Sequence, residues 1–442
     1  MKDGSWGSGS EALAVEAYKT KEVDFKFRGR NFRFALSHGL FSAADIDGGT
    51  RFLLKVLSKT WDDDIRQGRP LPKTILDAGC GVGVLGICAG AVLGSGGPRR
   101  VRCQDRDELA RAFTLSNAFK NNVSTDILSA HTEPLLGGPF LEPWDLILSN
   151  VPAKAGKPVL EDFVSRSAGL LTPSGRVILA AVNSLAGFFR SRILKTGAAV
   201  LHDETGKDHT VFVYGSAAVR AKPIQTGEQF FLDHPFYQRN SGGYELEGVS
   251  YTLDAVQGVG DFDSPGGTVR SAAKLITRLY TRKQFLSSIG SMLIHEPAQG
   301  HFPAWFIHYL ARELPGKPFF PDLLVLSSRN ILALEGSRHN IRKVREITLE
   351  TVPLADLNIG RERLSRATGY DLIVAFPEPV PRTDRIIPLW EGITALLTPK
   401  GIAVLGFPAS EAERFDRKKP QSVTRLCDSK HKGFRALAYQ IR

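Results

Sequence analysis

The sequence predicts two α/β domains in tandem, each built on a mostly parallel sheet with helices on both faces. Three observations carry this prediction. A glycine-rich turn follows a short apolar strand within residues 73–94, and an acidic residue closes the next apolar strand, residues 99–105. The run "DLILSN" at 145–150 recurs as "DLIVAF" at 371–376. Alternating strands and helices are typical of βαβ units, and the recurrence indicates that a whole domain is duplicated.

The length of the chain favours two domains. Its 442 residues exceed one ordinary domain, and 42% apolar with 23% charged residues is typical of a globular protein. The opening "MKDGSWGSGS" is rich in Gly and Ser, so we expect residues 1–22 to be disordered. We expect a first domain at 23–215, a linker at 216–244 and a second domain at 245–442.

Composition also bounds the compartment and the partners. No apolar run approaches the length of a membrane span, and no signal-peptide core is present, so we expect no membrane association. The four cysteines form no CxxC pair and have no zinc-ligand spacing, which favours a reducing, cytoplasmic location. A formal charge of +11 favours a polyanionic partner such as RNA.

The glycine-rich turn is the first candidate binding element. In "KTILDAGCGVGVLG" an apolar strand leads to Asp77, and then Gly79, Gly81 and Gly83 stand at alternate positions before a helix. Glycines allow positive φ and let a ligand approach the main chain closely. The spacing is not that of the dinucleotide-binding fingerprint. Asp77 would repel a pyrophosphate, but it can accept a hydrogen bond from an ammonium group.

The following strand sharpens the choice of ligand. "RRVRCQD" ends in Asp105, 28 residues after Asp77. An acid that closes the second strand of a βαβ unit is placed to accept both hydroxyls of a ribose. A ligand with a ribose, an ammonium and a carboxylate, but no phosphate, is S-adenosylmethionine. The sequence therefore predicts an S-adenosylmethionine site.

Several motifs, taken in order, resemble those of class I S-adenosylmethionine-dependent methyltransferases. They are "ILDAGCGVG", "CQD" and "DLILSNVP". "LFSAADIDGGTRFLLKVL" upstream, with "AKAGKPVL" and "LLTPSGRVILAAV" downstream, is similar to segments of the ribosomal RNA guanine-N2 methyltransferases. The resemblance covers about residues 23–215. It implies Rossmann-like domains with seven-stranded sheets, of which the second is a degenerate copy.

The resemblance gives the tripeptide Asn150–Val151–Pro152 the catalytic role. The donor already carries its methyl group on a sulfonium, so neither a metal nor a covalent nucleophile is required. The Asn150 side-chain oxygen and the Val151 carbonyl would accept the N–H bonds of an amino group held about 3 Å from the methyl carbon. These bonds strengthen as the nitrogen becomes positive, and therefore favour the transition state.

The family pattern also implies further contacts with the cofactor. Phe41, Gly49 and Thr50 would help to close the site. His131 would either lie near the adenine amino group or serve as a structural residue. The sequence departs from the family pattern after Asn150, where Val151 replaces a proline and Ala153 replaces the aromatic residue that stacks on the target base. Two nearby lysines, Lys154 and Lys157, would either contact phosphates or remain solvated.

The second half keeps the apolar scaffold but loses the chemistry. Phe376 stands where Asn150 stood, Ser328 falls on the position of Asp105, and "MLIHEPAQGHFPAW" replaces the glycine-rich turn. We place Glu296 at the position of Asp77, with Gly300 as the one glycine that is kept. The basic segment 414–425 in this half is a candidate RNA contact or a solvated loop.

The sequence thus predicts methyl transfer to an exocyclic amino group, and the flanking segments favour N2 of a guanine in ribosomal RNA. Two alternatives stay open. One is a methyltransferase for a protein glutamine or a DNA adenine, which an Asn at this position would serve equally well. The other is a non-catalytic RNA-binding or ribosome-assembly factor, which the departures at Val151 and Ala153 keep in view.

Overall fold

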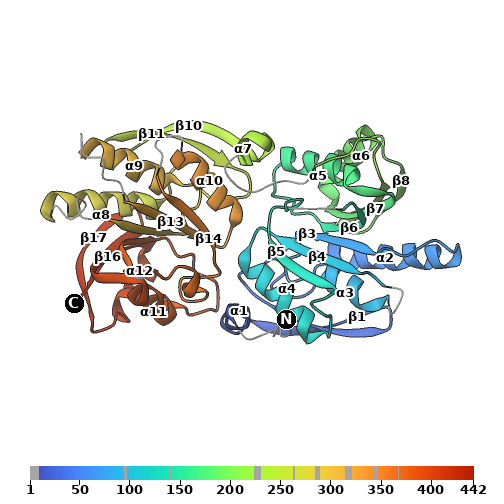
Figure 1. The fold of residues 1–442 in the computed structure, drawn as a ribbon, viewed down its shortest axis with the longest axis horizontal. Helices are drawn as coiled ribbons and strands as arrows, with labels where there is room; N and C mark the ends of the chain where they lie inside the picture. The colour runs from blue at the N-terminus through green and yellow to red at the C-terminus, as the bar shows by residue number, and fades with distance from the viewer. Residues whose placement is uncertain are drawn as a thin grey trace. The chain divides into compact units, whose positions relative to one another are not determined.

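The computed structural model describes residues 9–93, 97–138, 142–222, 230–261, 264–283, 289–313, 321–342, 347–366 and 368–442. The chain divides into two compact units, residues 1–236 and 237–442 (Figure 1). The division lies inside the expected linker, whose last residues already belong to strand β10 (Gln238–Leu246) of the second unit. Among the described residues, no helix has the length and apolar character needed to cross a membrane.

The N-terminal segment differs from the expectation of disorder over 1–22. Residues 1–8 lie outside the described residues, but helix α1 (Ser10–Tyr18) follows them. Ala14 and Tyr18 are buried, α1 packs on helix α4, and Glu11 pairs with Arg111 of α4 at 3.0 Å. The Gly- and Ser-rich opening therefore gives way to a packed helix earlier than its composition suggests.

The first unit is a doubly wound α/β domain with helices on both sides of its sheet (Figure 1). Its sheet has the strand order β5-β4-β3-β6-β7-β9-β8, and all neighbours are parallel except the pairs formed by β9. A separate antiparallel hairpin, β1–β2, precedes it. Its further elements are β1 (Lys21–Phe27), β2 (Arg30–Leu36), α2 (Gly48–Arg66), β3 (Thr74–Ala78), α3 (Val84–Val92), β4 (Arg100–Asp105), α4 (Glu108–Lys120), β5 (Leu128–Thr132), β6 (Trp144–Asn150), α5 (Lys157–Gly169), β7 (Leu171–Val182), α6 (Ala186–Lys195), β8 (Val200–Thr205), β9 (His209–Gly215) and the short α7 (Phe230–Asp233).

The strand order places a ligand crevice at the centre of this sheet. From β3 the chain passes first to β4 on one side and later to β6 on the other, so the order reverses at β3. In open α/β sheets, ligands bind beyond the carboxyl ends of the strands at such a point. All five residues of β3 are buried, as expected for a central parallel strand covered on both faces.

The second unit repeats this architecture. Its sheet has the order β14-β13-β12-β15-β16-β18-β17, which matches the first sheet strand for strand, and the hairpin β10–β11 precedes it. Its further elements are β11 (Val249–Val256), α8 (Gly267–Lys283), β12 (Ser291–His295), α9 (His301–Glu313), β13 (Leu323–Ser328), α10 (Ile331–Arg342), β14 (Leu349–Pro353), β15 (Tyr370–Ala375), α11 (Ile386–Leu396), β16 (Leu397–Pro408), α12 (Ala409–Arg417), β17 (Val423–His431) and β18 (Phe434–Ile441). The predicted fold class, two tandem Rossmann-like domains with seven-stranded sheets, is confirmed.

Individual hydrogen bonds confirm the repeat. Asp145 Oδ2 accepts from the main-chain N–H groups of residues 73 and 74, and Asp371 Oδ2 accepts from those of residues 290 and 291. Asn117 clamps the main chain of Ala35 with both ends of its amide, and Asn340 does the same to Asp254. These buried polar groups fix loops of the scaffold in both units.

Strand register corrects one position in our comparison of the two halves. Asp77 pairs with Leu148 across β3 and β6, whereas Ile294 pairs with Val374 across β12 and β15. Asp77 therefore corresponds to Ile294, and Glu296 corresponds to Gly79. The two acids stand near each other in sequence but occupy different positions, one inside the strand and one in the turn.

Candidate active site

The glycine-rich turn joins β3 to α3 at the predicted crevice. Gly79, Gly81 and Gly83 have φ values of 78°, 56° and 86°, which lie in the left-handed region that favours glycine. The N–H groups of Gly79 and Cys80 donate to the Gln104 carbonyl at 2.9 and 3.0 Å, which ties the turn to the end of β4. The turn thus has the compact shape that the glycine spacing predicts.

Asp77 is fully buried beside this turn. Its Oδ2 accepts from the Gly86 N–H at 2.8 Å and so anchors the first turn of α3, while its Oδ1 has no hydrogen-bond partner in the described part of the chain. Burial raises the pKa of Asp77 to about 7, against the lowering effect of the Gly86 N–H. A cationic group at the turn would offset the cost of this buried charge, which fits the ammonium of S-adenosylmethionine.

Asp105 lies against the same turn. Its Oδ2 accepts from the Gly81 N–H at 3.0 Å and its Oδ1 from the Asp107 N–H at 3.1 Å. Burial and the neighbouring Asp107 raise the pKa of Asp105. The structure therefore brings Asp105, the predicted ribose acid, and the predicted turn together. The carboxylates of Asp77 and Asp105 are acceptors that fit the ammonium and the ribose hydroxyls of S-adenosylmethionine.

Asn150, at the end of β6, is held by two residues from the start of α2. Its Nδ2 donates to Asp47 Oδ2 at 2.7 Å and to Thr50 Oγ1 at 3.1 Å. Asp47 Oδ2 also accepts from the N–H groups of Gly49 and Thr50, so the same carboxylate caps α2 and orients the amide. Because a carboxylate only accepts, the Asn150 NH₂ group must face Asp47, and the carbonyl oxygen is left to face elsewhere.

Asp47 is a positioning residue that our sequence analysis did not name. Its signal was present, because an acid directly before Gly-Gly-Thr at a helix start is typical of an N-cap. Gly49 is needed for space at this point. A Cβ there would lie 2.8 Å from His209 Cδ2 and 2.9 Å from both Asn150 Oδ1 and Asp47 Oδ2.

The residues after Asn150 form a turn at the surface. Val151 is buried and its N–H donates to the Ala180 carbonyl at 3.1 Å, whereas Pro152 is exposed and accepts from the Ala155 N–H at 2.9 Å. Ala153 and Lys154 are exposed as well. Position 153 therefore supplies no aromatic ring beside the Asn150 amide to stack on a target base.

Phe41 and His131 are two further residues that the sequence predicts to contact the cofactor. Phe41 is 70% exposed on the loop between β2 and α2. His131 bonds to Ser129 Oγ at 3.0 Å, and burial together with Arg102 and Arg111 lowers its pKa to about 4, so the ring is uncharged near neutral pH. In the described part of the chain neither residue hydrogen-bonds to the turn or to Asn150, and their contacts with the cofactor stay predictions.

The corresponding place in the second unit is filled by side chains. Glu296 and Ala298 keep the positive φ of the lost glycines, 55° and 49°, beside Gly300 at 88°. The Glu296 carboxylate accepts from Ser328 Oγ at 2.7 Å and from the Arg329 N–H at 2.8 Å. Phe376, at the position of Asn150, is buried against Phe302 with ring centroids 5.4 Å apart.

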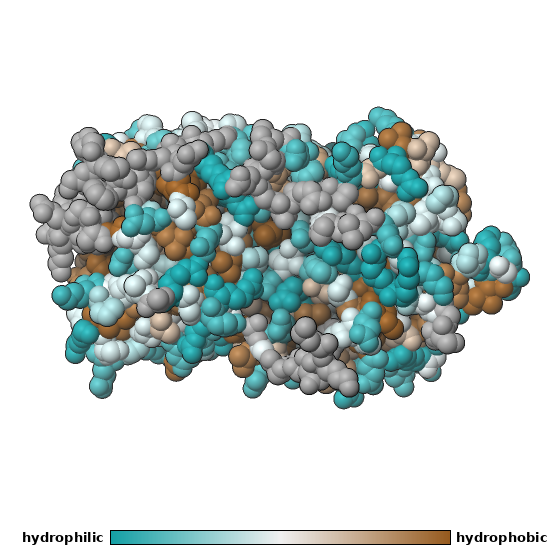
Figure 2. All heavy atoms as spheres, viewed as in Figure 1, coloured by the Kyte–Doolittle hydropathy of each residue, from teal (hydrophilic) through white to brown (hydrophobic). Residues whose placement is uncertain are grey.

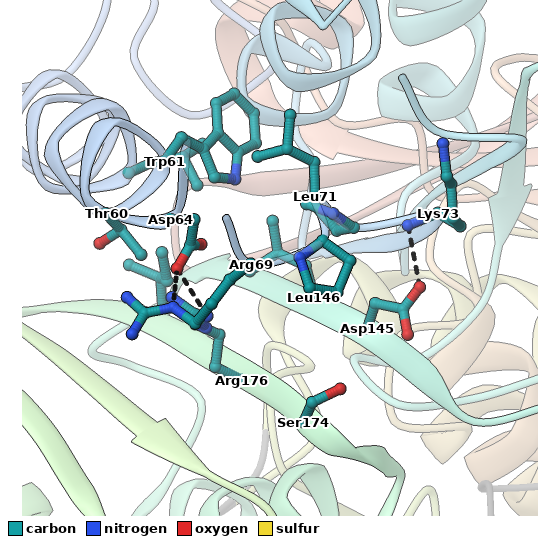
Figure 3. A pocket seen from close by; sticks show the side chains of 14 residues that line it. Thr60, Trp61, Asp64, Arg69, Leu71, Lys73, Asp145, Leu146, Ser174 and Arg176 are labelled. Atoms are coloured by element: carbon teal, nitrogen blue, oxygen red, sulfur yellow. Dashed lines mark hydrogen bonds and ion pairs between the residues drawn. The ribbon is translucent and has the colours of Figure 1, made fainter. Parts of the chain in front are cut away.

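The first unit also has a cavity of about 240 Å³ (Figure 3). Residues at the amino ends of the strands line it, among them Lys73 before β3 and Asp145 of β6. Asp64 lies in its wall and accepts from Arg69 at 2.7 Å and from Arg176 at 3.1 Å. The cavity therefore occupies the opposite edge of the sheet from Asn150.

Among the described residues, no group of three or more His, Cys, Asp or Glu side chains is placed to hold a metal ion. All four cysteines are free, and Cys80, Cys88 and Cys103 are buried. Burial raises the pKa of each of these three thiols, so they are unreactive at neutral pH.

Comparison with known proteins gives a family match within the first unit. Residues 31–196 match the family model of the methyltransferase small domain. The uncharacterized protein YbxB of Bacillus subtilis is 27% identical over 168 residues, which are 38% of this chain and 77% of that protein. The ribosomal RNA small subunit methyltransferase C of Chromohalobacter salexigens is 31% identical over 174 residues, 38% of this chain but only 46% of that protein.

One solved structure spans both units. The 16S rRNA N2 methyltransferase RsmC of T. thermophilus, in complex with AdoMet and guanosine, superposes with a TM-score of 0.60 over 97% of this chain and 100% of that chain. At 16% identity this likeness shows the fold alone. The tandem arrangement of two such domains is thus shared with a solved protein.

Proposed function

We propose that this chain, whose residues 31–196 form a domain of the methyltransferase small family, transfers a methyl group from S-adenosylmethionine to an exocyclic amino group, namely N2 of a guanine in ribosomal RNA. The observation that carries the proposal is the oriented amide of Asn150. It lies at the carboxyl edge of the sheet, where the strand order reverses, and its carbonyl oxygen is turned away from Asp47.

S-adenosylmethionine supplies a methyl group that is already activated on a cationic sulfur. The protein has to bind this donor and orient the acceptor amino group toward the methyl carbon. The glycine-rich turn admits the amino-acid portion close to the main chain, and the buried Asp77 offsets its ammonium. Asp105 accepts hydrogen bonds from the ribose hydroxyls, and the Gly81 N–H holds its carboxylate in place.

Asn150 acts on the acceptor. Its Oδ1 and the Val151 carbonyl accept the two N–H bonds of the substrate amino group and direct the nitrogen lone pair toward the methyl carbon. The bonds become stronger as positive charge develops on the nitrogen, so they lower the barrier more than they tighten substrate binding. Asp47 and Thr50 make this possible because they fix the amide without using its oxygen.

RNA is the polyanionic partner in this proposal. A guanine amino group in folded RNA is reached when the base is unstacked. Lys154 and Lys157 are exposed in and after the turn that follows Asn150, and in this proposal they contact phosphates. Hydrophilic side chains are spread over the visible face of each unit (Figure 2). Within the segment 414–425, Arg414, Lys418 and Arg425 pair with acidic neighbours, which lowers the charge available there.

The second unit has no catalytic or cofactor-binding role in this proposal. Glu296 and Phe376 occupy the places of a glycine and of the catalytic amide, and no ribose acid stands at Ser328. It extends the surface available to RNA. The four free cysteines support a reducing, cytoplasmic location in this proposal.

The purified chain tests this proposal with radiolabelled S-adenosylmethionine and three acceptors: deproteinised ribosomal RNA, duplex DNA and ribosomal proteins. We expect label in the RNA, and digestion to nucleosides should release it as N2-methylguanosine. Label in DNA or in a protein instead would replace the proposed acceptor with one of the alternatives. No transfer to any acceptor, from a chain that binds the donor, would favour an assembly factor.

A further inference from the structure

His209 lies beside Asn150, although 59 residues separate them in the sequence. A Cβ placed on Gly49 would be 2.8 Å from His209 Cδ2 and 2.9 Å from Asn150 Oδ1. The imidazole and the catalytic oxygen are therefore separated by no more than the sum of these two distances. Both side chains thus adjoin Gly49 at the start of α2.

The turn that carries His209 is fixed by a network around Asn183. Asn183 Nδ2 donates to the carbonyls of Gly206 and Lys207 at 3.1 and 2.9 Å, and its main-chain N–H donates to the Asp208 carbonyl at 3.0 Å. Thr210 Oγ1 donates back to Asn183 Oδ1 at 2.9 Å. The half-buried imidazole is thus presented by a rigid turn at the start of β9.

The duplicated unit shows what the fold itself requires at this position. His209 pairs with Val182 across β9 and β7, and Phe434 pairs with Pro408 across β18 and β16, so Phe434 is the counterpart of His209. A Cβ on Gly267, the counterpart of Gly49, would fall on the Phe434 ring. In both units an aromatic ring therefore packs against the start of a helix, α2 in the first unit and α8 in the second. In the second unit this ring is the apolar phenyl group of Phe434.

The two exchanges go together. Where the amide of Asn150 is replaced by Phe376, the imidazole is replaced by Phe434. Packing alone is satisfied by a phenyl ring, so the nitrogen atoms of His209 are not needed to build the fold. They are found only in the unit that keeps the amide.

We propose that His209 is a second catalytic residue, which contacts the amino group being methylated and accepts the proton that this group loses. The inference rests on the proposed function. As the bond from the amino nitrogen to the methyl carbon forms, the bond from that carbon to sulfur breaks and its electron pair stays on sulfur. The nitrogen then carries the positive charge. The proton that was hydrogen-bonded to Asn150 Oδ1 then leaves the nitrogen for a ring nitrogen of His209, which passes it to solvent, while the other N–H bond stays on the Val151 carbonyl.

The charges around the ring are those of Asp47 from the cap of α2 and of Lys207 and Asp208 from the turn itself. Lys207 and Asp208 are exposed, whereas Asp47 shares the Gly49 site with the imidazole. The uncharged Phe52 of α2 and Asn183 lie against Gly206 in the turn that carries His209. Only the neutral ring accepts a proton, so this role is lost as the imidazole becomes protonated at low pH.

Two substitutions separate this role from packing. His209→Phe copies the ring of the second unit and removes the proton acceptor, and His209→Gln keeps polarity without basicity. We expect both variants to bind S-adenosylmethionine within about twofold of the wild type and to transfer methyl groups about a hundredfold more slowly in single turnovers. With the chain saturated in S-adenosylmethionine, the wild-type rate should fall on acidification, and His209→Phe should show a smaller fall. His202→Gln on the adjacent β8 is the control and should behave as the wild type.

Ring-proton NMR gives a readout that does not depend on turnover. The His209 signals, identified by their loss in His209→Phe, should shift when guanosine is added to the chain saturated with S-adenosylhomocysteine. Variants that transfer at the wild-type rate with the wild-type pH profile would overturn the role of His209. Absence of RNA methylation by the wild type would instead refute the proposed function, and the NMR titration would still decide whether the ring contacts a guanine.

Discussion

Replacing Asn150 by Ala is expected to slow methyl transfer roughly a hundredfold, which corresponds to a barrier about 3 kcal/mol higher. The substitution removes the oxygen that accepts from the substrate amino group, a contact that is strongest in the transition state. Cofactor affinity should stay nearly unchanged, because the turn and Asp105 do not hydrogen-bond to Asn150 in the described part of the chain. Single-turnover rates and calorimetric titration measure the two effects separately.

The Asp47–Asn150 pair offers a sharper version of this test. Asn150→Asp places two carboxylates at the 2.7 Å contact and should be as slow as Asn150→Ala. Adding Asp47→Asn restores a donor opposite a carboxylate, so the double variant should recover part of the lost rate. A transfer rate for Asn150→Ala equal to that of the wild type would mean that Asn150 is only a turn residue.

The whole chain is expected to bind one equivalent of S-adenosylmethionine, and Asp105→Ala should weaken that binding about tenfold or more. The ribose hydroxyls lose their charged acceptor, and no second site remains, because Glu296 and Phe376 fill the corresponding place. The matched control is Ser328→Ala at the position equivalent to Asp105, which should leave the affinity for S-adenosylmethionine unchanged. Two equivalents, or binding that survives Asp105→Ala unaltered, would contradict the assignment of a silent second unit.

The pH dependence of this binding has a defined sign. The ionised Asp105 accepts from both hydroxyls, and protonation removes acceptor capacity. Because burial raises the pKa of Asp105, affinity should begin to fall on acidification at a higher pH than for an exposed aspartate.

The fold was predictable because the signals are local. The signals are the strand, glycine turn and helix at 73–94 and the repeated "DLI" runs, and each depends only on residues close together in the sequence. The matching strand orders of the two sheets agree with the duplication that these signals predict. The pairing of Glu296 with Asp77 failed because side-chain chemistry was used to align positions that only strand register defines. Glu296 instead adopts the backbone of a lost glycine, at φ 55°.

The site was predictable in part. Asp105 lies against the turn at Gly81, and Asn150 lies against Thr50 and Gly49, which the motifs had named only as residues that close the cofactor site. Their roles stay predictions. Asp47 carried a capping signal that was overlooked. His209 carried none, because it enters from β9, an antiparallel strand separated from β6 by β7, and it meets Asn150 where both pack against the start of α2. Contacts of this kind exist only once the sheet is assembled.

The measurement that tests the central claim most directly is a map of methylated nucleosides in cells. Ribosomal and transfer RNA from a strain lacking this gene, and from the same strain carrying the wild type or Asn150→Ala, would be compared by mass spectrometry. We predict that one N2-methylguanosine in ribosomal RNA disappears, returns with the wild type and stays absent with Asn150→Ala. RNA that is unchanged in all strains, with a methyl group missing from a protein instead, would contradict the account.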